Sequence, residues 1–222
     1  MNLVGAYCNT PLQGVSRRIS SLRGFAMKFN PDRHRRRSMR LKGWDYSRPG
    51  GYFVTICTQG RECRLGKIAG GKMRLSDAGE MVRWTWEELP SKYPGVEIDA
   101  FVVMPNHVHG IIVLTDAVGA GPRARPGPHT RPVEGRPQGA APTRFSLPDV
   151  VHRFKSLTTA RYRSGVARLG WPPFSARFWQ RNYYEHILRG EAEMDRAREY
   201  VLCNPLKWTE DENHPMNVEN RP

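Results

Sequence analysis

Two apolar runs separated by a short polar centre occupy the middle of the chain. The runs Ile98–Met104 and Gly110–Leu114 are rich in Val and Ile, a composition typical of buried strands. Pro105-Asn106 lies between them and is a turn-type dipeptide, so the chain is predicted to reverse direction there. The pattern therefore predicts two adjacent strands joined by a tight turn.

Two histidines stand where the second of these strands begins. Side chains alternate between the faces of a strand, so His107 and His109 are predicted to share one face, with Val108 on the other. Two neighbouring imidazoles are a candidate pair of metal ligands. The triplet alone is equally compatible with one buried core histidine and one surface histidine.

Hydrophobic periodicity along the rest of the chain predicts both strands and helices. In chain order the further elements are a strand at Tyr52–Thr58, a helix at Leu75–Tyr93 capped by Ser76, a basic amphipathic helix at Leu147–Arg163 and a helix at Glu191–Cys203. A fourth core strand is harder to place, because residues 178–184 fit either a strand or a helical lead-in. The order of strands and helices indicates an α+β sandwich.

The chain is strongly basic. Its 222 residues suit one domain, and its net charge of +14 indicates a polyanionic partner such as nucleic acid. A purely structural role would explain the charge equally well. Four scattered cysteines without a CxxC pair argue against a zinc ribbon or a disulfide scaffold and fit a reducing cytoplasm. The expected location is therefore cytoplasmic, with nucleoid association expected for a protein that binds DNA. No stretch approaches the roughly 20 apolar residues of a membrane span, so no membrane partner is expected.

Two segments depart from the pattern of a folded domain. Residues 1–40 hold nine Lys or Arg and one acid, which predicts a flexible basic arm; a misassigned start codon is the alternative interpretation. Residues 116–145 hold six prolines and five glycines with almost nothing apolar, which predicts a disordered insertion. The domain is therefore predicted to span residues 41–208, followed by a C-terminal tail at residues 209–222.

The last predicted helix carries a second group of candidate residues. Tyr200 and Asn204 stand four positions apart, so they project from one helix face. A tyrosine hydroxyl is a candidate covalent nucleophile, and a carboxamide oxygen is a candidate third metal ligand.

The two segments before that helix contain candidates for DNA contacts. The helix at Leu147–Arg163 has a basic face, and Arg177–Arg189 interleaves arginines with aromatic residues, a combination that pairs with phosphates and stacks on unpaired bases. A merely solvated basic face is the alternative for the helix. The candidate residues are Arg153, Lys155, Arg161, Arg177 and Arg181.

Three motifs carry a resemblance to a known family. The stretches MPNHVHGIIVL, WQRNYYEHILR and REYVLCNPLKW resemble the REP-associated tyrosine transposases. These enzymes form a single-tyrosine branch of the HUH nucleases, where HUH denotes His, a bulky apolar residue and His. The resemblance runs from about Arg40 to Trp208 and is interrupted by the predicted insertion. The basic arm, the insertion and Cys203 depart from the family pattern, and none of them touches the matched site positions.

The resemblance implies roles for individual residues. His107 and His109 match the pair that binds a divalent cation, here Mg²⁺ or Mn²⁺. Tyr200 matches the nucleophile, and Asn204 matches the polar residue that completes the metal site. His186 falls in the family's Y/W-E-H segment and is assigned only a DNA-contacting or supporting role.

For the whole chain, the resemblance implies a metal-dependent endonuclease and strand transferase of single-stranded DNA. Cleavage would pass through a 5′-phosphotyrosine intermediate at hairpin-forming repetitive palindromic DNA, and a single nucleophilic tyrosine per chain implies a homodimer. The implied fold is a ferredoxin-like antiparallel sheet with helices packed on one face and Tyr200 on a C-terminal helix.

Three other functions stay open at this point. A basic, non-catalytic nucleic-acid-binding module would leave Tyr200 as a packed core residue. HUH enzymes of replication initiation or plasmid nicking commonly carry further domains, for which 222 residues leave no room. A zinc-dependent hydrolase built on His107 and His109 lacks a third His, Asp or Glu at a convincing spacing.

Overall fold

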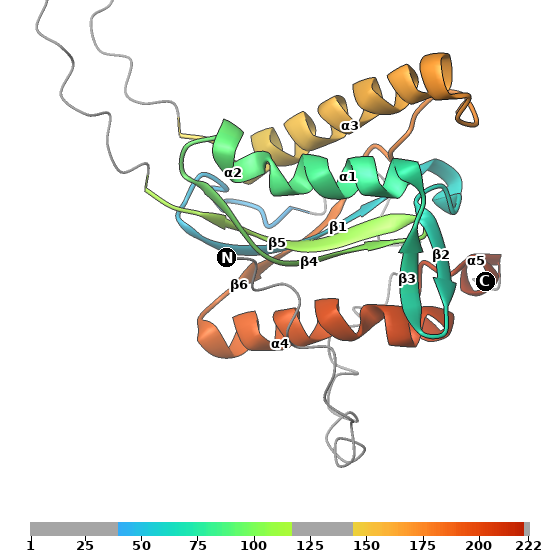
Figure 1. Ribbon diagram of the computed structural model, residues 1–222. Helices are drawn as coiled ribbons and strands as arrows, with labels where there is room; N and C mark the ends of the chain where they lie inside the picture. The colour runs from blue at the N-terminus through green and yellow to red at the C-terminus, as the bar shows by residue number, and fades with distance from the viewer. Residues whose placement is uncertain (1–39, 117–143, 220–222) are drawn as a thin grey trace, which may run out of the picture. The chain divides into compact units, whose positions relative to one another are not determined.

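The computed structural model describes residues 40–116 and 144–219 (Figure 1). The predicted basic arm and the predicted insertion lie almost entirely outside these ranges. The strands are β1 (Gly50–Cys57), β2 (Gly66–Ala69), β3 (Lys72–Leu75), β4 (Val96–Met104), β5 (His107–Leu114) and β6 (Tyr184–Leu188). The helices are α1 (Asp77–Glu87), α2 (Leu89–Lys92), α3 (Leu147–Leu169), α4 (Glu191–Cys203) and α5 (Pro215–Glu219), with short 3-10 helices η4 (Gln59–Arg61) and η5 (Asn204–Glu210).

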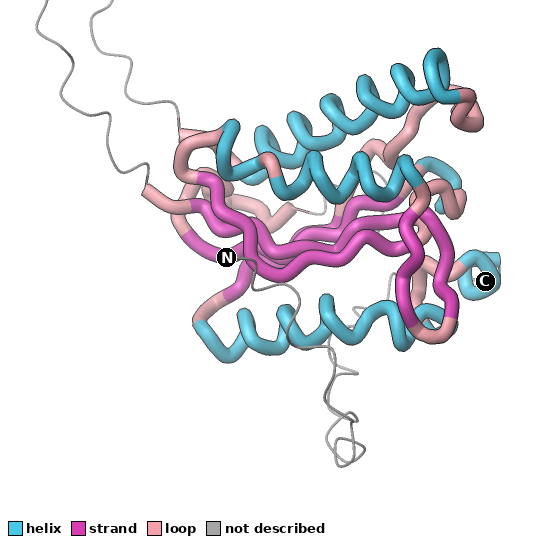
Figure 2. Tube along the Cα trace, in the orientation of Figure 1, coloured by secondary structure: helices cyan, strands magenta, loops and turns pink. Residues whose placement is uncertain are grey.

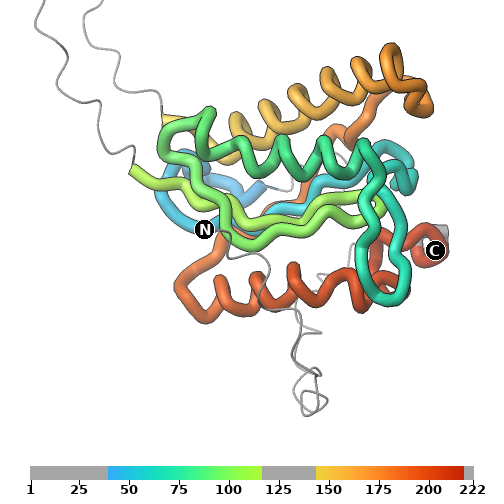
Figure 3. Tube along the Cα trace, viewed as in Figure 1, coloured from blue at the N-terminus to red at the C-terminus, as the bar shows by residue number. Residues whose placement is uncertain are grey.

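Four strands form one antiparallel sheet in the spatial order β4-β5-β1-β6, which places β5 and β1 at its centre. With α1 after β1 and α3 after β5, the chain follows the β-α-β-β-α-β order of a ferredoxin-like fold. The α+β prediction is therefore confirmed. The fourth strand is β6, which begins at Tyr184, so only the last of residues 178–184 belongs to it. β2 and β3 form a separate hairpin that lies beside η5 (Figure 3).

Helices cover both faces of the four-stranded sheet (Figures 1 and 2). α1 and α3 pack together on one face, whereas α4 lies across β4, β5 and β6 on the opposite face. This differs from the predicted arrangement of helices on one face only. The physical reason is that the two central strands are buried on both sides, so each side needs a covering layer.

The larger core lies between the sheet and the pair α1 and α3. Tyr52, Val54 and Ile56 reach it from alternate positions of β1. They are joined by Trp86 of α1 and Phe154 of α3, whose rings meet edge to face with centroids 5.1 Å apart. This core fixes the relative positions of β1, α1 and α3.

The smaller core lies between the sheet and α4. Phe53 of β1 and Ile111 of β5 are buried there against Ala197 and Val201 of α4. Because side chains alternate along a strand, Phe53 faces α4 while its neighbours on β1 face the larger core. This core holds α4 over the centre of the sheet.

The first residues of α1 and α3 explain where these helices begin. The side chain of Ser76 accepts a hydrogen bond from the backbone N–H of Gly79, which confirms the predicted cap. Ser146 and Asp149 form a reciprocal capping box at the start of α3.

No helix in the described ranges is both long and apolar enough to cross a membrane.

Gly110 of β5 has no room for a side chain beneath α1. A Cβ atom at this position would lie 2.4 Å from Cζ2 of Trp86 and 3.1 Å from Cβ of Phe101. We expect Gly110→Ala to lower the free energy of unfolding in urea by about 1–3 kcal/mol, the usual cost of overpacking a core. Gly51→Ala is the control, because its closest contact would be the flexible end of Met194. Equal losses at both positions would contradict this packing argument.

Candidate active site

The two histidines lie on the central strand β5, directly after a two-residue turn. Pro105 and Asn106 form this turn between β4 and β5. His107 and His109 are neighbours on the α4 side of the sheet, with ring centroids 4.3 Å apart, while Val108 belongs to the larger core on the other side. The predicted hairpin and the shared face of the two histidines are confirmed.

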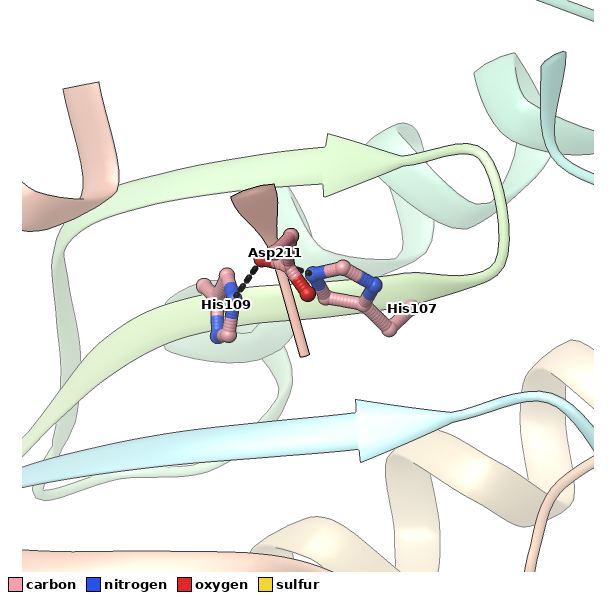
Figure 4. A group of neighbouring side chains, drawn as sticks. All are labelled: His107, His109 and Asp211. Atoms are coloured by element: carbon pink, nitrogen blue, oxygen red, sulfur yellow. Dashed lines mark ion pairs between the residues drawn. The ribbon is translucent and has the colours of Figure 1, made fainter. Parts of the chain in front are cut away.

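Asp211 joins the two histidines from a distant part of the chain (Figure 4). Its Oδ2 atom lies 3.9 Å from Nε2 of His107 and 3.7 Å from Nε2 of His109. All three side chains are buried, and one nitrogen or oxygen atom from each lies within 4.8 Å of the others. The three side chains therefore point toward one another and form a single candidate metal centre.

The carboxylate of Asp211 is oriented by its own loop. Its Oδ1 atom accepts a hydrogen bond from the backbone N–H of Asn213 at 2.6 Å, which leaves Oδ2 facing the imidazoles. The backbone C=O of Asp211 accepts hydrogen bonds from the N–H of His214 and from the side-chain amide of Asn217. The predicted tail at residues 209–222 thus contains two buried residues, Asp211 and Asn213, that belong to the site.

These three side chains fit a divalent cation. Nε2 of His107 and Nε2 of His109 are buried, and neither has a hydrogen-bond partner among the residues that the structure describes. Their distances to Asp211 are too long for hydrogen bonds. However, two ligand atoms that bind the same ion, each through a bond of about 2.1 Å, can lie up to about 4.2 Å from each other. Buried nitrogen lone pairs that face a carboxylate are costly unless a cation or a proton lies between them.

Burial and neighbouring charges set the protonation states at this centre. Burial, followed by the charge of His109, lowers the pKa of His107 well below 6.5, so its imidazole is neutral at pH 7. Burial alone would raise the pKa of Asp211, but the two imidazoles and the N–H of Asn213 outweigh it and hold this pKa below its usual value. A neutral imidazole and an ionised carboxylate are the forms that bind metal.

Tyr200 lies on α4 and contacts one residue of the candidate metal centre, His109. Its ring meets the ring of His109 edge-on, with centroids 5.2 Å apart, and the ring of Phe53 at 5.7 Å. Phe53 also stacks on His109 at 5.5 Å, so the three rings restrict one another. Burial, and next the carboxylates of Asp211 and Glu212, raise the pKa of Tyr200 above its ordinary value of 10.0. The phenol is therefore neutral at pH 7 and has to lose its proton to act as a nucleophile.

Asn204, the third ligand that the family resemblance implies, lies one turn after Tyr200 at the start of η5. Its side chain is buried, and its Oδ1 atom makes no hydrogen bond within the described ranges. This oxygen is available as a ligand, but the carboxylate beside the imidazoles is that of Asp211. The role of Asn204 therefore stays a prediction.

Two residues of the site were missed by sequence reasoning. Oγ1 of Thr55 lies 2.8 Å from Nδ1 of His109, opposite it across the β1–β5 ladder, and this strand register has no signal in the sequence. For Asp211 the only signal is its place in the acidic run Glu210-Asp211-Glu212 of a basic chain. Nothing in that run marks which acid is buried.

The predicted DNA-contacting residues of α3 lie on the sheet face opposite to the metal centre. Arg153 lies over the ring of Tyr93 near the start of α3. Lys155 donates hydrogen bonds from Nζ to three backbone C=O groups, those of residues 180–182. Arg161 donates a hydrogen bond to the carboxylate of Glu88, the C-terminal cap residue of α1, and forms an ion pair with it. Both Lys155 and Arg161 are thus bonded to groups of the protein itself, and their contacts with DNA stay predictions.

The remaining predicted DNA contacts lie on the segment after α3 and on β6. Arg177 and Arg181 line an open groove of about 730 Å³ beside α3. His186 pairs with Phe53 in the ladder between β6 and β1, and its Nε2 lies 3.6 Å from a carboxylate oxygen of Glu193. The structure brings none of these three into the His-His-Asp group, and their contacts with DNA stay predictions.

Two cations beside α3 are expected to respond differently to substitution. Lys155→Met removes three hydrogen bonds of a half-buried ammonium group, so we expect the free energy of unfolding to fall by about 2 kcal/mol, with little change in DNA affinity. Arg177→Ala is expected to leave the free energy of unfolding unchanged and to weaken DNA binding. The slope of log affinity against log salt concentration should become smaller by about one, as expected for the loss of one phosphate contact. Urea denaturation and fluorescence anisotropy at several salt concentrations measure both effects. The opposite pattern would contradict these assignments.

Comparison with known proteins places the chain among relatives. No family model matches it. An uncharacterized protein of Haemophilus influenzae is 39% identical over 191 residues, which cover 83% of this chain and 96% of that protein. The chain belongs to the same family as this protein.

A second protein of Haemophilus influenzae, named "Putative REP-associated tyrosine transposase", is 23% identical over 165 residues. The match covers 73% of this chain and 74% of that protein, and it confirms the resemblance to the REP-associated tyrosine transposases. Among solved structures, that of a REP-associated tyrosine transposase bound to a REP hairpin matches with a TM-score of 0.47 and 19% identity. It covers 76% of this chain and 73% of that chain.

Proposed function

We propose that the chain is a metal-dependent endonuclease and strand transferase of single-stranded DNA, with Tyr200 as its nucleophile. The observation that carries this proposal is the convergence of His107, His109 and Asp211, together with the contact between the rings of Tyr200 and His109 at a centroid distance of 5.2 Å. Metal ligands next to a candidate nucleophile are the parts that a phosphoryl-transfer site requires. The relationship to REP-associated tyrosine transposases supports the same class of reaction.

The metal would be held by His107, His109 and Asp211, and Asn204 would offer a fourth donor through Oδ1. A divalent cation bound there would polarise the scissile phosphate and offset the charge that develops on it. Imidazole nitrogens suit transition metals, whereas Mg²⁺ is held mainly by oxygen ligands. Of the two cations implied by the family resemblance, the donor set therefore favours Mn²⁺ over Mg²⁺.

Cleavage would transfer the phosphate to Tyr200. The phenol oxygen would attack phosphorus and give its proton to water, while the bond from phosphorus to the 3′ oxygen breaks. The 3′ oxygen would take up a proton from water, so that the leaving strand ends in a 3′-hydroxyl. The fragment on the other side of the cut stays attached as a 5′-phosphotyrosine. Contacts with Phe53 and His109 limit the rotation of the Tyr200 ring, which reduces the entropy lost on reaching the reactive geometry. Attack by another 3′-hydroxyl on this linkage would rejoin DNA without ATP.

We infer that the DNA substrate is single-stranded and folds into hairpins at repetitive palindromic elements. The resemblance to the REP-associated family supports this substrate, and the net charge of +14 suits a phosphate backbone. One nucleophilic tyrosine per chain makes two chains necessary for recombination at two DNA ends. A homodimer is therefore proposed as the active form.

End-labelled hairpin oligonucleotides with varied flanking sequences test the class of activity. With Mn²⁺ or Mg²⁺ we expect nicking, and label on the fragment 3′ of the cut should migrate with the protein on a denaturing gel. With EDTA no adduct is expected. Tight binding that is equal in metal and in EDTA, without any cleavage, would overturn the proposal in favour of a non-catalytic binding module.

A further inference from the structure

Asn106 is a fully buried side chain whose hydrogen-bonding groups are all used. Its Nδ2 atom donates to the backbone C=O of Arg61 at 2.9 Å and to that of Asn213 at 2.8 Å. Its Oδ1 atom lies 2.8 Å from Nδ1 of His107. One amide therefore links η4, the candidate metal ligand on β5 and the C-terminal segment that carries Asp211.

The partners of this amide determine which nitrogen of His107 carries the proton. Both partners of Nδ2 are carbonyl oxygens, which only accept, so the NH₂ group of Asn106 must face them. The amide oxygen is thereby turned toward Nδ1 of His107, and since this oxygen only accepts, Nδ1 must donate. In a neutral imidazole the lone pair then lies on Nε2, the atom that faces Asp211.

The same amide holds the other side of the metal centre. The C=O of Asn213 accepts from Asn106, and the N–H of Asn213 donates to Oδ1 of Asp211 at 2.6 Å. A short path of hydrogen bonds thus connects the ligand on β5 with the ligand contributed by the segment after η5. Without the amide, two carbonyl oxygens and Nδ1 of His107 would lose these hydrogen-bond partners.

We propose that Asn106 is a positioning residue of the metal centre, which keeps His107 in the Nδ1–H form and keeps the Asp211 segment beside it. This inference rests on the proposed function, because it assumes that the His-His-Asp group binds a cation. Outer groups that fix the tautomer and the orientation of a ligating imidazole typically change metal affinity by about 10- to 100-fold when they are lost.

Asn217 provides a matched control. Its side-chain amide also donates to two backbone C=O groups, those of Thr209 and Asp211, so it anchors the same segment without bonding to His107. Asn106→Ala and Asn217→Ala in the full chain therefore separate tautomer control from simple anchoring of the segment.

Two measurements without DNA test the inference. In long-range ¹H–¹⁵N spectra of the metal-free protein, the wild type and Asn217→Ala should carry the His107 proton on Nδ1, and Asn106→Ala should lose this preference. Calorimetric titration with Mn²⁺ should show an affinity about 10- to 100-fold weaker for Asn106→Ala. The change for Asn217→Ala should stay within about threefold.

Several results would overturn the inference, and they are distinguishable from failure of the nuclease proposal. A wild-type His107 protonated on Nε2 would do so even if Asn106→Ala failed to fold. Equal Mn²⁺ affinities for Asn106→Ala and Asn217→Ala would also overturn the inference. A wild type that binds no Mn²⁺ would remove the metal centre and the inference together. Normal Mn²⁺ binding without any DNA cleavage would overturn only the nuclease proposal.

Discussion

Tyr200→Phe is expected to abolish covalent attachment to DNA and to reduce cleavage by at least about 10⁴-fold, as loss of a nucleophile does in other enzymes. The substitution removes only the hydroxyl group, and the ring contacts with Phe53 and His109 remain. Mn²⁺ affinity and DNA affinity should therefore stay within about twofold of wild type. Denaturing gels with labelled hairpin DNA measure the adduct, and anisotropy measures the binding.

Tyr184→Phe is the matched control for this result. Tyr184 lies on β6, on the same side of the sheet, and its ring meets the same Phe53 ring at a centroid distance of 6.3 Å. We expect this variant to keep the adduct. An adduct that survives Tyr200→Phe and disappears in Tyr184→Phe would show that the nucleophile has been assigned to the wrong tyrosine.

Asp211→Asn is expected to weaken Mn²⁺ binding by at least about 100-fold, more than the typical loss of an outer-sphere partner, and to reduce cleavage with it. The change removes the negative charge that faces both imidazoles while keeping the size of the side chain. Calorimetric titration with Mn²⁺ measures the affinity, and the cleavage assay at saturating Mn²⁺ shows whether added metal restores activity.

Glu210→Gln serves as the control for Asp211→Asn, because it removes a charge from the adjacent, exposed position. It should leave Mn²⁺ affinity unchanged.

Asn204→Ala distinguishes the two candidates for the third ligand. If Asn204→Ala lost Mn²⁺ binding while Asp211→Asn retained it, the third ligand would be the carboxamide that the family resemblance implies.

Local patterns predicted the elements that carry the site. The hairpin around Pro105-Asn106 and the helix at Glu191–Cys203 were predictable because each depends on neighbours in sequence: strand-forming runs beside a turn, and a helical run that an Asn-Pro pair ends. β6 was not placed, because a five-residue strand at the sheet edge has a weak pattern. The side of the sheet that α4 covers depends on the need to bury both faces of the sheet. The hydrophobic periodicity of the helix alone does not contain this information.

The same distinction applies to the site. His107 and His109 share a face because strand geometry alone requires it. Asp211 directly follows η5 and is about a hundred residues away from the histidines in sequence, so its position beside them depends on tertiary packing. The contacts of Lys155 also required the structure, because a helical wheel places a lysine by angle and ignores the C=O groups that a later segment supplies.

Mapping the covalent DNA adduct to a residue tests the central proposal most directly. The wild-type protein is trapped on a hairpin substrate with Mn²⁺, the DNA is trimmed by nuclease, and the tryptic peptides are analysed by tandem mass spectrometry. The proposed mechanism predicts a nucleotide phosphate on Tyr200, within the peptide Glu199–Lys207. A nucleotide on Tyr184 or any other residue, or cleavage without a covalent adduct, would contradict it.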